Sequence, residues 1–186
     1  RVSSPTSQDL YSVVAVSAID AWAVGGEFTP AENSIITHWD GNSWSNVAMP
    51  TTKALMSIAV VSPTDAWAVG YGGTTLHWDG STWTLIGQQP GAVLFSIAMT
   101  SPSDGWAVGI DYSTRQGLLA HWDGLTWARV ALRMPDALRA VSLTSSADGW
   151  AVGDEGTILH WDGSTWAAAS SPTEELLRGI AMESTT

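Results

Sequence analysis

The sequence predicts an all-β protein, a β-propeller built from four-stranded antiparallel blades. The tetrapeptide Trp-Ala-Val-Gly occurs four times, beginning at Trp22, Trp67, Trp106 and Trp150. Each copy is followed by His-Trp-Asp-Gly and then by a third tryptophan, so the four copies account for all 12 tryptophans of the chain. A repeat of roughly 40 residues that holds several short strands is typical of a propeller blade.

The spacing within the repeat is strict except at one point. In every copy an opening leucine precedes the first tryptophan by 12 residues, the histidine precedes the third tryptophan by 6, and the next leucine follows after 11. Only the step from the first tryptophan to the histidine varies, at 16, 10, 15 and 10 residues. The common unit is therefore 39 residues long. We expect blades at approximately 9–48, 54–87, 93–131 and 137–169 of a single propeller domain or propeller segment.

The second copy shows how the first half of each blade is built. Residues 55–61 are apolar and rich in β-branched side chains, as expected for an innermost strand. Residues 62–65 contain Pro63 at the second position of a turn. In the following strand, alternation places Trp67 and Val69 on one face and two alanines and a glycine on the other. One face is bulky and the other nearly bare, so a neighbouring sheet can approach closely.

The second half of the repeat predicts a hairpin. Residues 74–78 form the third strand, Asp79-Gly80 is a strong hairpin signal, and the fourth strand begins near Trp83. In this register Leu76, Trp78 and Trp83 share one face and His77 lies on the other. Such sheets bury both faces by stacking radially on copies of themselves. A β-solenoid is the alternative, although its repeats are usually shorter and its strands parallel; helical solenoids are excluded because the chain has no helical period.

The end of the chain begins the repeat again. Residues 168–186 match residues 1–19 at an offset of 167, which predicts one extra innermost strand at 176–184. Such a strand cannot pair its own backbone. Either the sequence is an excerpt of a longer propeller, which we favour, or the strand pairs in trans or supplements the ring. The first residue is Arg1, which indicates a processed form or a piece of a longer protein.

Composition excludes several classes of partner. The chain has 18 acidic and 7 basic residues, a formal charge of −11, which disfavours nucleic-acid phosphates and anionic membranes. It contains no apolar run long enough for a membrane span. Cysteine is absent, which excludes disulfides and thiolate metal sites.

The repeat resembles known bacterial propeller repeats. The layout Leu-x-x-Ile-Ala-x-x-Ser-Pro-x-Asp-Ala-Trp-Ala-Val-Gly, followed by Gly-x-x-x-His-Trp-Asp-Gly-x-x-Trp, is most similar to the repeats of photosystem II assembly factors of the Ycf48 type. It is also similar to the Asp-box repeats of sialidase-like propellers and to kelch repeats. An Asp-box usually places its aspartate five residues before the aromatic residue, whereas Asp79 lies four before Trp83, and His77 stands where serine or threonine is expected. The resemblance implies a propeller fold and a binding or scaffolding role, and it transfers no catalytic residue.

The repeated side chains are interpreted as structural. Invariant tryptophans are expected to pack between blades, because an exposed sugar-binding platform is not needed to explain them. The four histidines belong to different blades and are expected to bond neighbouring backbone, not a shared metal ion. The aspartates before each Trp-Ala-Val-Gly strand and those opening each hairpin are assigned to turns, with calcium as the weaker alternative. We therefore expect no cofactor and no metal.

Function is predicted in the loops between the second and third strands, where the insertions occur. Loops carried by a rigid scaffold are where binding residues are found most often. All four loops should emerge on one rim and form an acidic surface with scattered aromatic residues. The candidate binding residues are Glu27, Phe28, Asn33, Tyr71, Asp111, Tyr112, Arg115, Asp154 and Glu155.

These observations predict a non-enzymatic binding or scaffold module. We expect an extracellular or cell-surface bacterial protein that contacts a protein partner through the rim loops, with self-association through the extra terminal strand as a further option. The alternative is a lectin-like propeller that binds glycans through tryptophan- and aspartate-lined pockets. A sialidase-like glycoside hydrolase is the third class, and the scatter of the six arginines over non-equivalent positions disfavours it.

Overall fold

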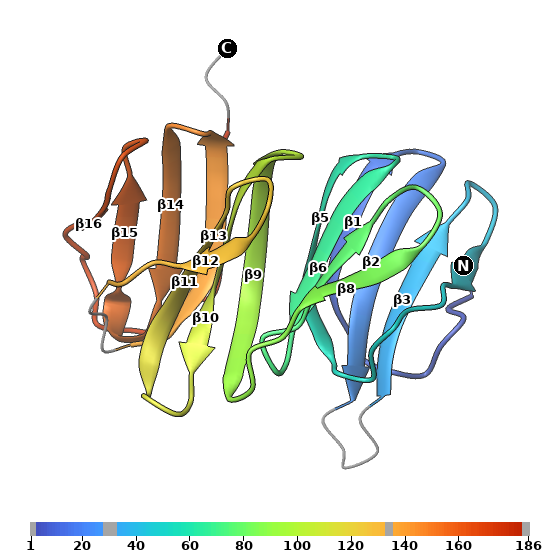
Figure 1. The fold of residues 1–186 in the computed structure, drawn as a ribbon, viewed down its shortest axis with the longest axis horizontal. Coiled ribbons are helices and arrows are strands. Elements are labelled where there is room, and N and C mark those ends of the chain that lie inside the picture. Colours follow the sequence, from blue (N-terminus) through green and yellow to red (C-terminus); the bar gives the residue numbers. More distant parts are fainter. Residues whose placement is uncertain (1–2, 28–32, 133–135, 184–186) are drawn as a thin grey trace. The chain divides into compact units, whose positions relative to one another are not determined.

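The structure is a computed structural model, and it describes residues 3–27, 33–132 and 136–183. The strands form four antiparallel sheets of four strands each, in which consecutive strands pair side by side (Figure 1). The predicted all-β class with four-stranded antiparallel blades is confirmed. The chain divides into two compact units, residues 1–90 and 91–186, each of which holds two blades.

The first unit holds blades 1 and 2. Blade 1 consists of β1 (Leu10–Ser17), β2 (Asp20–Glu27), β3 (Asn33–Trp39) and β4 (Trp44–Asn46). Blade 2 consists of β5 (Leu55–Ser62), β6 (Asp65–Gly70), β7 (Thr75–Trp78) and β8 (Trp83–Gly87).

The second unit holds blades 3 and 4. Blade 3 consists of β9 (Ala92–Ser101), β10 (Asp104–Asp111), β11 (Gln116–Trp122) and β12 (Trp127–Arg129). Blade 4 consists of β13 (Leu138–Ser145), β14 (Asp148–Gly153), a short 3-10 turn η1 (Asp154–Gly156), β15 (Ile158–Trp161) and β16 (Trp166–Ala168).

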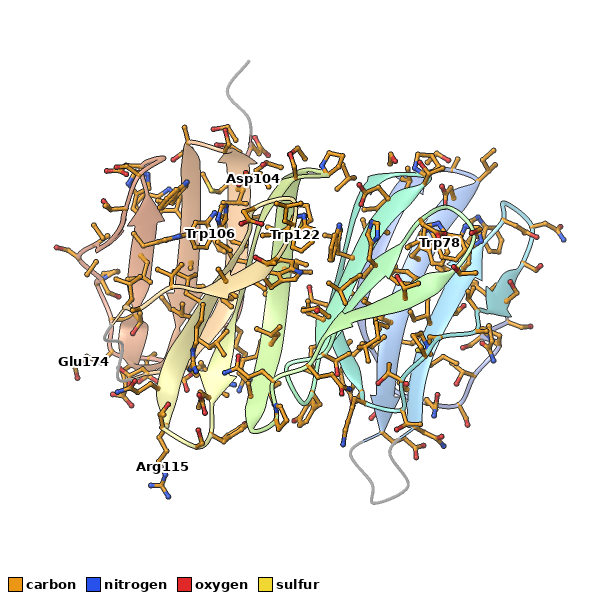
Figure 2. The ribbon with its side chains drawn as sticks, viewed as in Figure 1. Trp78, Asp104, Trp106, Arg115, Trp122 and Glu174 are labelled. Carbon is orange, nitrogen blue, oxygen red and sulfur yellow. The ribbon has the colours of Figure 1, made fainter. Side chains whose placement is uncertain are left out.

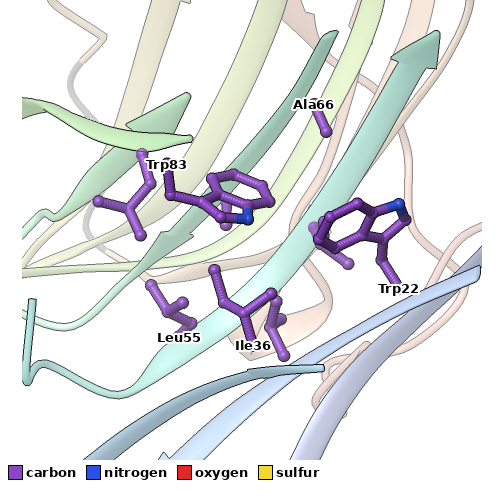
Figure 3. Packing of buried hydrophobic residues seen from close by; sticks show 9 residues of the cluster. Trp22, Ile36, Leu55, Ala66 and Trp83 are labelled. Atoms are coloured by element: carbon purple, nitrogen blue, oxygen red, sulfur yellow. The ribbon is translucent and has the colours of Figure 1, made fainter. Parts of the chain in front are cut away.

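The core of the first unit lies between the facing sides of its two blades. Trp22, Val24 and Ile36 of blade 1 pack against a buried face of blade 2. Figure 3 shows the indoles of Trp22 and Trp83 within this cluster. A buried indole removes about 150–250 Å² from water, which is worth roughly 4–6 kcal/mol before entropy is subtracted. Burial of Trp22 therefore makes a large contribution to the packing of blade 1 against blade 2.

The face of blade 2 that receives these side chains differs from the prediction. Ala66 and Ala68 of the second strand leave room on it, as expected, but the outer strands fill part of that room with Leu76 and Trp83. Trp78 packs against the same cluster. The face is therefore a shaped apolar recess and not a bare surface, because only its second strand is small. The second unit repeats this packing with Trp106, Val108, Leu119, Leu138, Val141, Ala151, Leu159 and Trp166.

The predicted hairpin turn is present and carries its own hydrogen bonds. The Asp79 carboxylate accepts from the backbone N–H groups of Ser81 and Thr82, each at 2.8 Å, and from the Ser81 hydroxyl at 2.7 Å. These donors, the Thr82 N–H foremost, lower the pKa of Asp79 to about 2. The turn aspartate is thus a structural acceptor, as predicted for this set.

Backbone passes directly over the glycine of each Trp-Ala-Val-Gly sequence. A Cβ on Gly70 would lie 2.2 Å from the carbonyl oxygen of Ala54, in the segment that leads into blade 2. The next residue, Tyr71, donates its N–H to that same carbonyl at 2.9 Å. The glycine is therefore required by this close approach to the linking segment.

The extra strand predicted at 176–184 is not formed in residues 176–183, and residue 184 lies outside the described residues. The Leu177 N–H does bond the Gly153 carbonyl at 3.0 Å, so the segment begins along blade 4. An innermost strand needs the second strand of its own blade as a partner. None of the described residues provides that partner.

Candidate functional site

Each blade carries an Asp–His–Trp arrangement at one end of its second strand. In blade 2 one Asp65 carboxylate oxygen accepts from Nε1 of Trp67 at 3.0 Å and from Nε2 of His77 at 3.2 Å. The His77 ring lies against the Trp67 ring with centroids 4.4 Å apart. The same carboxylate–histidine bond recurs in the other blades, at 2.9, 2.8 and 2.9 Å, between Asp20 and His38, Asp104 and His121, and Asp148 and His160.

This arrangement corrects two predictions. The histidines bond a carboxylate, not backbone, and the aspartates before the tryptophan strand serve the histidines as well as starting the strand. The reason lies in the strand register: Asp65 and Trp67 share a face because they are two residues apart, and His77 lies opposite Trp67. Because the arrangement is present in every blade, we assign it to the scaffold.

The candidate loop residues of the first unit lie at the junction of β2 and β3 and after β6. Glu27 and Asn33 face each other as the last pair of β2 and β3, while Phe28 lies outside the described residues. Tyr71 follows β6. Burial, then the neighbouring Asp9, and then Tyr71 and Glu27 raise the pKa of Tyr11. Tyr71 and Glu27 therefore both act on Tyr11, which is not among the predicted site residues.

In blade 3 the candidate loop is held by a buried carboxylate. Asp111 is 4% exposed, and it accepts from the Ser113 N–H at 2.9 Å and from Arg129 at 2.7 Å. The Ser113 hydroxyl and then Arg129 lower the pKa of Asp111 to about 2. Asp111 therefore positions the loop. The loop presents Tyr112, which is 55% exposed. It also presents Arg115, whose side chain points away from the blade (Figure 2).

In blade 4 the candidate aspartate joins an ion pair. Asp154 accepts from Nε and a terminal nitrogen of Arg139 at 2.6 and 2.7 Å, a two-pronged contact. The Arg139 guanidinium also lies over the Phe95 ring, 4.6 Å from its centroid. Phe95 belongs to blade 3, so this contact connects the two blades of the second unit. Glu155, next in the chain, is exposed.

The residue that follows each opening leucine was not among the predicted site residues. This position holds Tyr11, Met56, Phe95 and Arg139, four large side chains of different chemistry in a repeat that is otherwise nearly uniform. Their variability at a fixed position was the available signal. In the structure Arg139 pairs with Asp154 of the blade 4 loop, and Tyr71 helps to raise the pKa of Tyr11, so this position interacts with loop residues in both units.

The backbone of the two loops in the second unit is strained. Among the described residues, Arg115 (φ 56°) and Glu155 (φ 52°) are the non-glycine residues with positive φ. Blade 2 has Gly72 (φ 67°) where blade 4 has Glu155. The left-handed conformation costs a residue with a side chain about 1–2 kcal/mol. Both strained residues are exposed, and both stand among the predicted binding residues.

The structure brings the candidates together in two groups, one in each unit. In the first unit Glu27 pairs with Asn33, and Glu27 and Tyr71 both act on Tyr11 of β1. In the second unit Tyr112, Arg115 and Glu155 are presented to solvent, while Asp111 and Asp154 hold their loops. Figure 2 places Arg115 and Glu174 at the same end of the second unit, and Asp104 of the Asp–His–Trp arrangement at the opposite end. Gly156 donates its N–H to the Glu175 carbonyl at 3.0 Å, which attaches the chain near Glu174 to the blade 4 loop.

The tryptophans do not form an exposed platform. Each of the 12 lies in the described part of the chain, and each is either buried or half-buried. In residues 3–27, 33–132 and 136–183, no group of three or more histidine, cysteine or acidic side chains is placed to hold a metal ion. No helix long and apolar enough to cross a membrane occurs over the same ranges.

Comparison with known proteins shows the fold. No protein-family model and no curated protein matches the chain. Among solved structures, YCF48 bound to a D1 peptide superimposes with a TM-score of 0.69 at 18% identity over 95% of this chain and 60% of that one. YCF48 from Cyanidioschyzon merolae gives 0.69 at 15% identity, over 100% of this chain and 67% of that one.

A third similar structure is the WD40 β-propeller domain of Doa1, with a TM-score of 0.70 at 14% identity over 96% of this chain and 60% of that one. The β-propeller fold and the structural likeness to Ycf48 are thus confirmed. The chain spans about 60% of the length of two of these structures. Nothing in the comparisons bears on the Asp-box and kelch likenesses or on a bacterial origin, which stay predictions.

Proposed function

We propose that the chain is a non-enzymatic binding module that contacts a protein partner through the loop end of its second unit. We define this loop surface by the exposed side chains of Tyr112, Arg115 and Glu155. The ion pair between Arg139 and Asp154 holds the chain next to Glu155. The setting we propose is extracellular or cell-surface.

The observation that carries the proposal is the coincidence of strain and exposure. Arg115 and Glu155 hold left-handed backbone conformations that a glycine would adopt at no steric cost, as Gly72 does in blade 2. Their side chains are exposed and do nothing visible for the core. Strain of this kind concentrates at binding sites, where the side chain has a use that offsets its cost. A protein-binding role explains why these two positions are not glycine.

Ion pairs and hydrogen bonds hold the side chains next to the loop surface in place, which favours binding. Asp111 is fixed by Arg129 and by its own loop, and Arg139 is fixed between Asp154 and Phe95. A preordered surface loses little entropy on association. Aromatic and arginine side chains such as Tyr112 and Arg115 are the types that dominate protein interfaces. The net charge of −11 favours a partner with a basic surface, since opposite charge speeds association.

Site-specific crosslinking tests the proposal directly. A photo-reactive amino acid replaces Tyr112 in one variant and Leu125 in another, and each is irradiated with proteins of the source organism before mass spectrometry. Leu125 is the matched control because it is 83% exposed and lies in the hairpin between β11 and β12, at the other end of the same blade. We expect one or a few proteins to crosslink through position 112 and not through position 125.

Binding measurements with the captured protein complete the test. Arg115→Ser and Glu155→Gly should each weaken its affinity about tenfold or more, the effect expected of central interface residues. Asn42→Ser, in an exposed hairpin turn of the first unit, should leave the affinity unchanged. Equal crosslinking at positions 112 and 125, or unaltered affinity in both loop variants, would reject the loop surface as the binding site.

A further inference from the structure

A polar cavity lies between the two blades of the second unit, at the ends of their innermost strands. Its volume is about 450 Å³, within the range of about 300–1,000 Å³ that is common for small-molecule sites. One wall comes from the end of β9 and the turn that follows it, and the other from the equivalent part of β13. Further along the same interface the Val141 N–H donates to the Ser96 hydroxyl at 3.2 Å, which joins the two strands directly. Both walls are therefore held together within one unit.

Hydroxyl groups dominate the lining of this cavity. Five of its eight lining residues carry one, namely Thr100, Ser101, Thr144, Ser145 and Ser146. A carboxylate, that of Asp104, is added at one wall. We call this cavity the hydroxyl pocket.

The two threonines are a departure from the repeat. Thr100 and Thr144 stand where blades 1 and 2 have Val16 and Val61. Valine has nearly the shape of threonine and serves the same strand position in the first unit, so the scaffold does not require a hydroxyl there. The second unit has the hydroxyl on both walls of the pocket, which indicates a use for the pair.

A second departure forms the apolar part of the lining. Gly105 and Gly149 stand where blades 1 and 2 have alanine. A Cβ on Gly105 would overlap Sδ of Met99, and one on Gly149 would overlap Cδ2 of Leu143. The methionine and leucine side chains therefore lie over bare backbone, and both line the pocket. An alanine at either position would push these side chains away from the sheet.

The polar groups of the pocket can both accept and donate hydrogen bonds. The Thr100 hydroxyl donates to the Asp104 carboxylate, and the Thr144 hydroxyl donates to the equivalent carboxylate of blade 4 at 2.6 Å. Each threonine oxygen keeps lone pairs that can accept from a ligand. The Ser145 hydroxyl accepts from the Ala147 N–H at 3.1 Å, which leaves its hydrogen available to a ligand.

We propose that the hydroxyl pocket binds a neutral sugar. Every sugar hydroxyl both donates and accepts, which matches a lining that offers both. The C–H groups of a sugar ring are apolar and match Met99 and Leu143. Most of the lining is uncharged, which favours a neutral ligand over an organic cation. Figure 2 places Asp104 at the end of the second unit opposite Arg115, so this site is separate from the loop surface and adds to the proposed protein binding.

Ligand-observed NMR on the whole chain tests the proposal. Glucose, galactose, mannose and N-acetylglucosamine are screened by saturation transfer, and a titration gives the Kd of those that bind. Thr100→Val and Thr144→Val should each weaken binding about two- to tenfold, the effect of losing one hydrogen bond. Valine is the residue of blades 1 and 2, so both variants should fold. Thr165→Val is the matched control, because Thr165 is exposed in the turn between β15 and β16 and lies outside the lining; its Kd should equal that of the parent.

A further variant tests the shape of the pocket without removing a polar group. Gly105→Ala places the residue of blades 1 and 2 in blade 3 and should move Met99 into the pocket, which should weaken binding about fivefold or more. The methyl glycosides of the sugars that bind distinguish two sources of the ligand. Equal binding of the methyl glycoside indicates the end of a glycan chain, and its loss indicates a free sugar.

Three results would overturn the proposal. The first is a parent chain that binds none of the sugars, and the second is sugar binding that both threonine variants leave unchanged. The third is binding of 1,4-diaminobutane without any sugar, which would show a cation site led by Asp104. None of these substitutions touches Tyr112, Arg115 or Glu155, so crosslinking through position 112 can succeed or fail independently of sugar binding.

Discussion

Replacing Gly70 by alanine should destabilise the first unit far more than its modest size suggests. The new Cβ would lie 2.2 Å from the Ala54 carbonyl oxygen and 2.8 Å from the Leu55 Cα. Real Cβ atoms essentially never approach other atoms to less than 3.0 Å, so the linking segment has to withdraw by about 1 Å. Leu55 is fully buried, and it would have to move with the segment.

The size of the effect follows from what that movement disturbs. Overpacking against a rigid neighbour typically costs about 1–3 kcal/mol. The hydrogen bond from the Tyr71 N–H to the Ala54 carbonyl, 2.9 Å long, would also be stretched or lost, at about 0.5–1.5 kcal/mol. We expect a total of about 3 kcal/mol. For a unit of this size each kcal/mol lowers the melting temperature by about 4–8 °C, so the fall should be about 12 °C or more.

Thermal unfolding followed by circular dichroism and tryptophan fluorescence measures this directly. Gly179→Ala is the control, because no atom lies within 4 Å of the position where its Cβ would be built. The control should melt within about 1 °C of the parent chain. A Gly70→Ala variant that melts within about 2 °C of the parent would show that the linking segment yields freely, and the reasoning from close approach would then be wrong.

Three further predictions concern the core, the turns and the strained loop. Trp83→Ala should cost about 3–5 kcal/mol of unfolding free energy in chemical denaturation, because Trp83 is buried. Trp44→Ala, at the equivalent position of blade 1, should cost less than half as much, because Trp44 is only half-buried. Equal losses would contradict the difference in burial. The pKa of Asp79 is about 2 in the folded chain against an ordinary value of 3.8, so its contribution to stability is present above about pH 4 and is lost as pH falls through 2; Asp79→Asn should flatten the acid limb of a pH–stability curve, and an unchanged limb would refute this. Glu155→Gly should raise the unfolding free energy by about 0.5–1 kcal/mol in the same denaturation assay, because it relieves a left-handed conformation, and a destabilised variant would show that the glutamate has a structural role.

Much of the blade could be predicted because its pattern is local. The placement of Leu76, Trp78 and Trp83 on one face followed from alternation and the Asp79-Gly80 turn, and the structure pairs Trp78 directly with Trp83. The hydrogen bond between Asp65 and His77 follows from the same register. It was not predicted, because Asp65 was assigned to a turn and His77 to a bond with neighbouring backbone. Arg139 was missed for a different reason: its partners lie in β9 (Phe95) and in the turn after β14 (Asp154), so no local spacing connects the three.

The sequence by itself determined the unit of construction: four copies, four strands in each, a second strand with one bulky and one small-residue face, and loops that vary in length while the strands keep their spacing. Strand alternation and turn chemistry act over a few residues, so they can be read along the chain. Only the tertiary structure decided which copies of the same residue are covered. Ile58 is 6% exposed and Val13 is 69% exposed at equivalent positions, because burial depends on whether a neighbouring sheet faces the position, and repetition in the sequence carries no record of that.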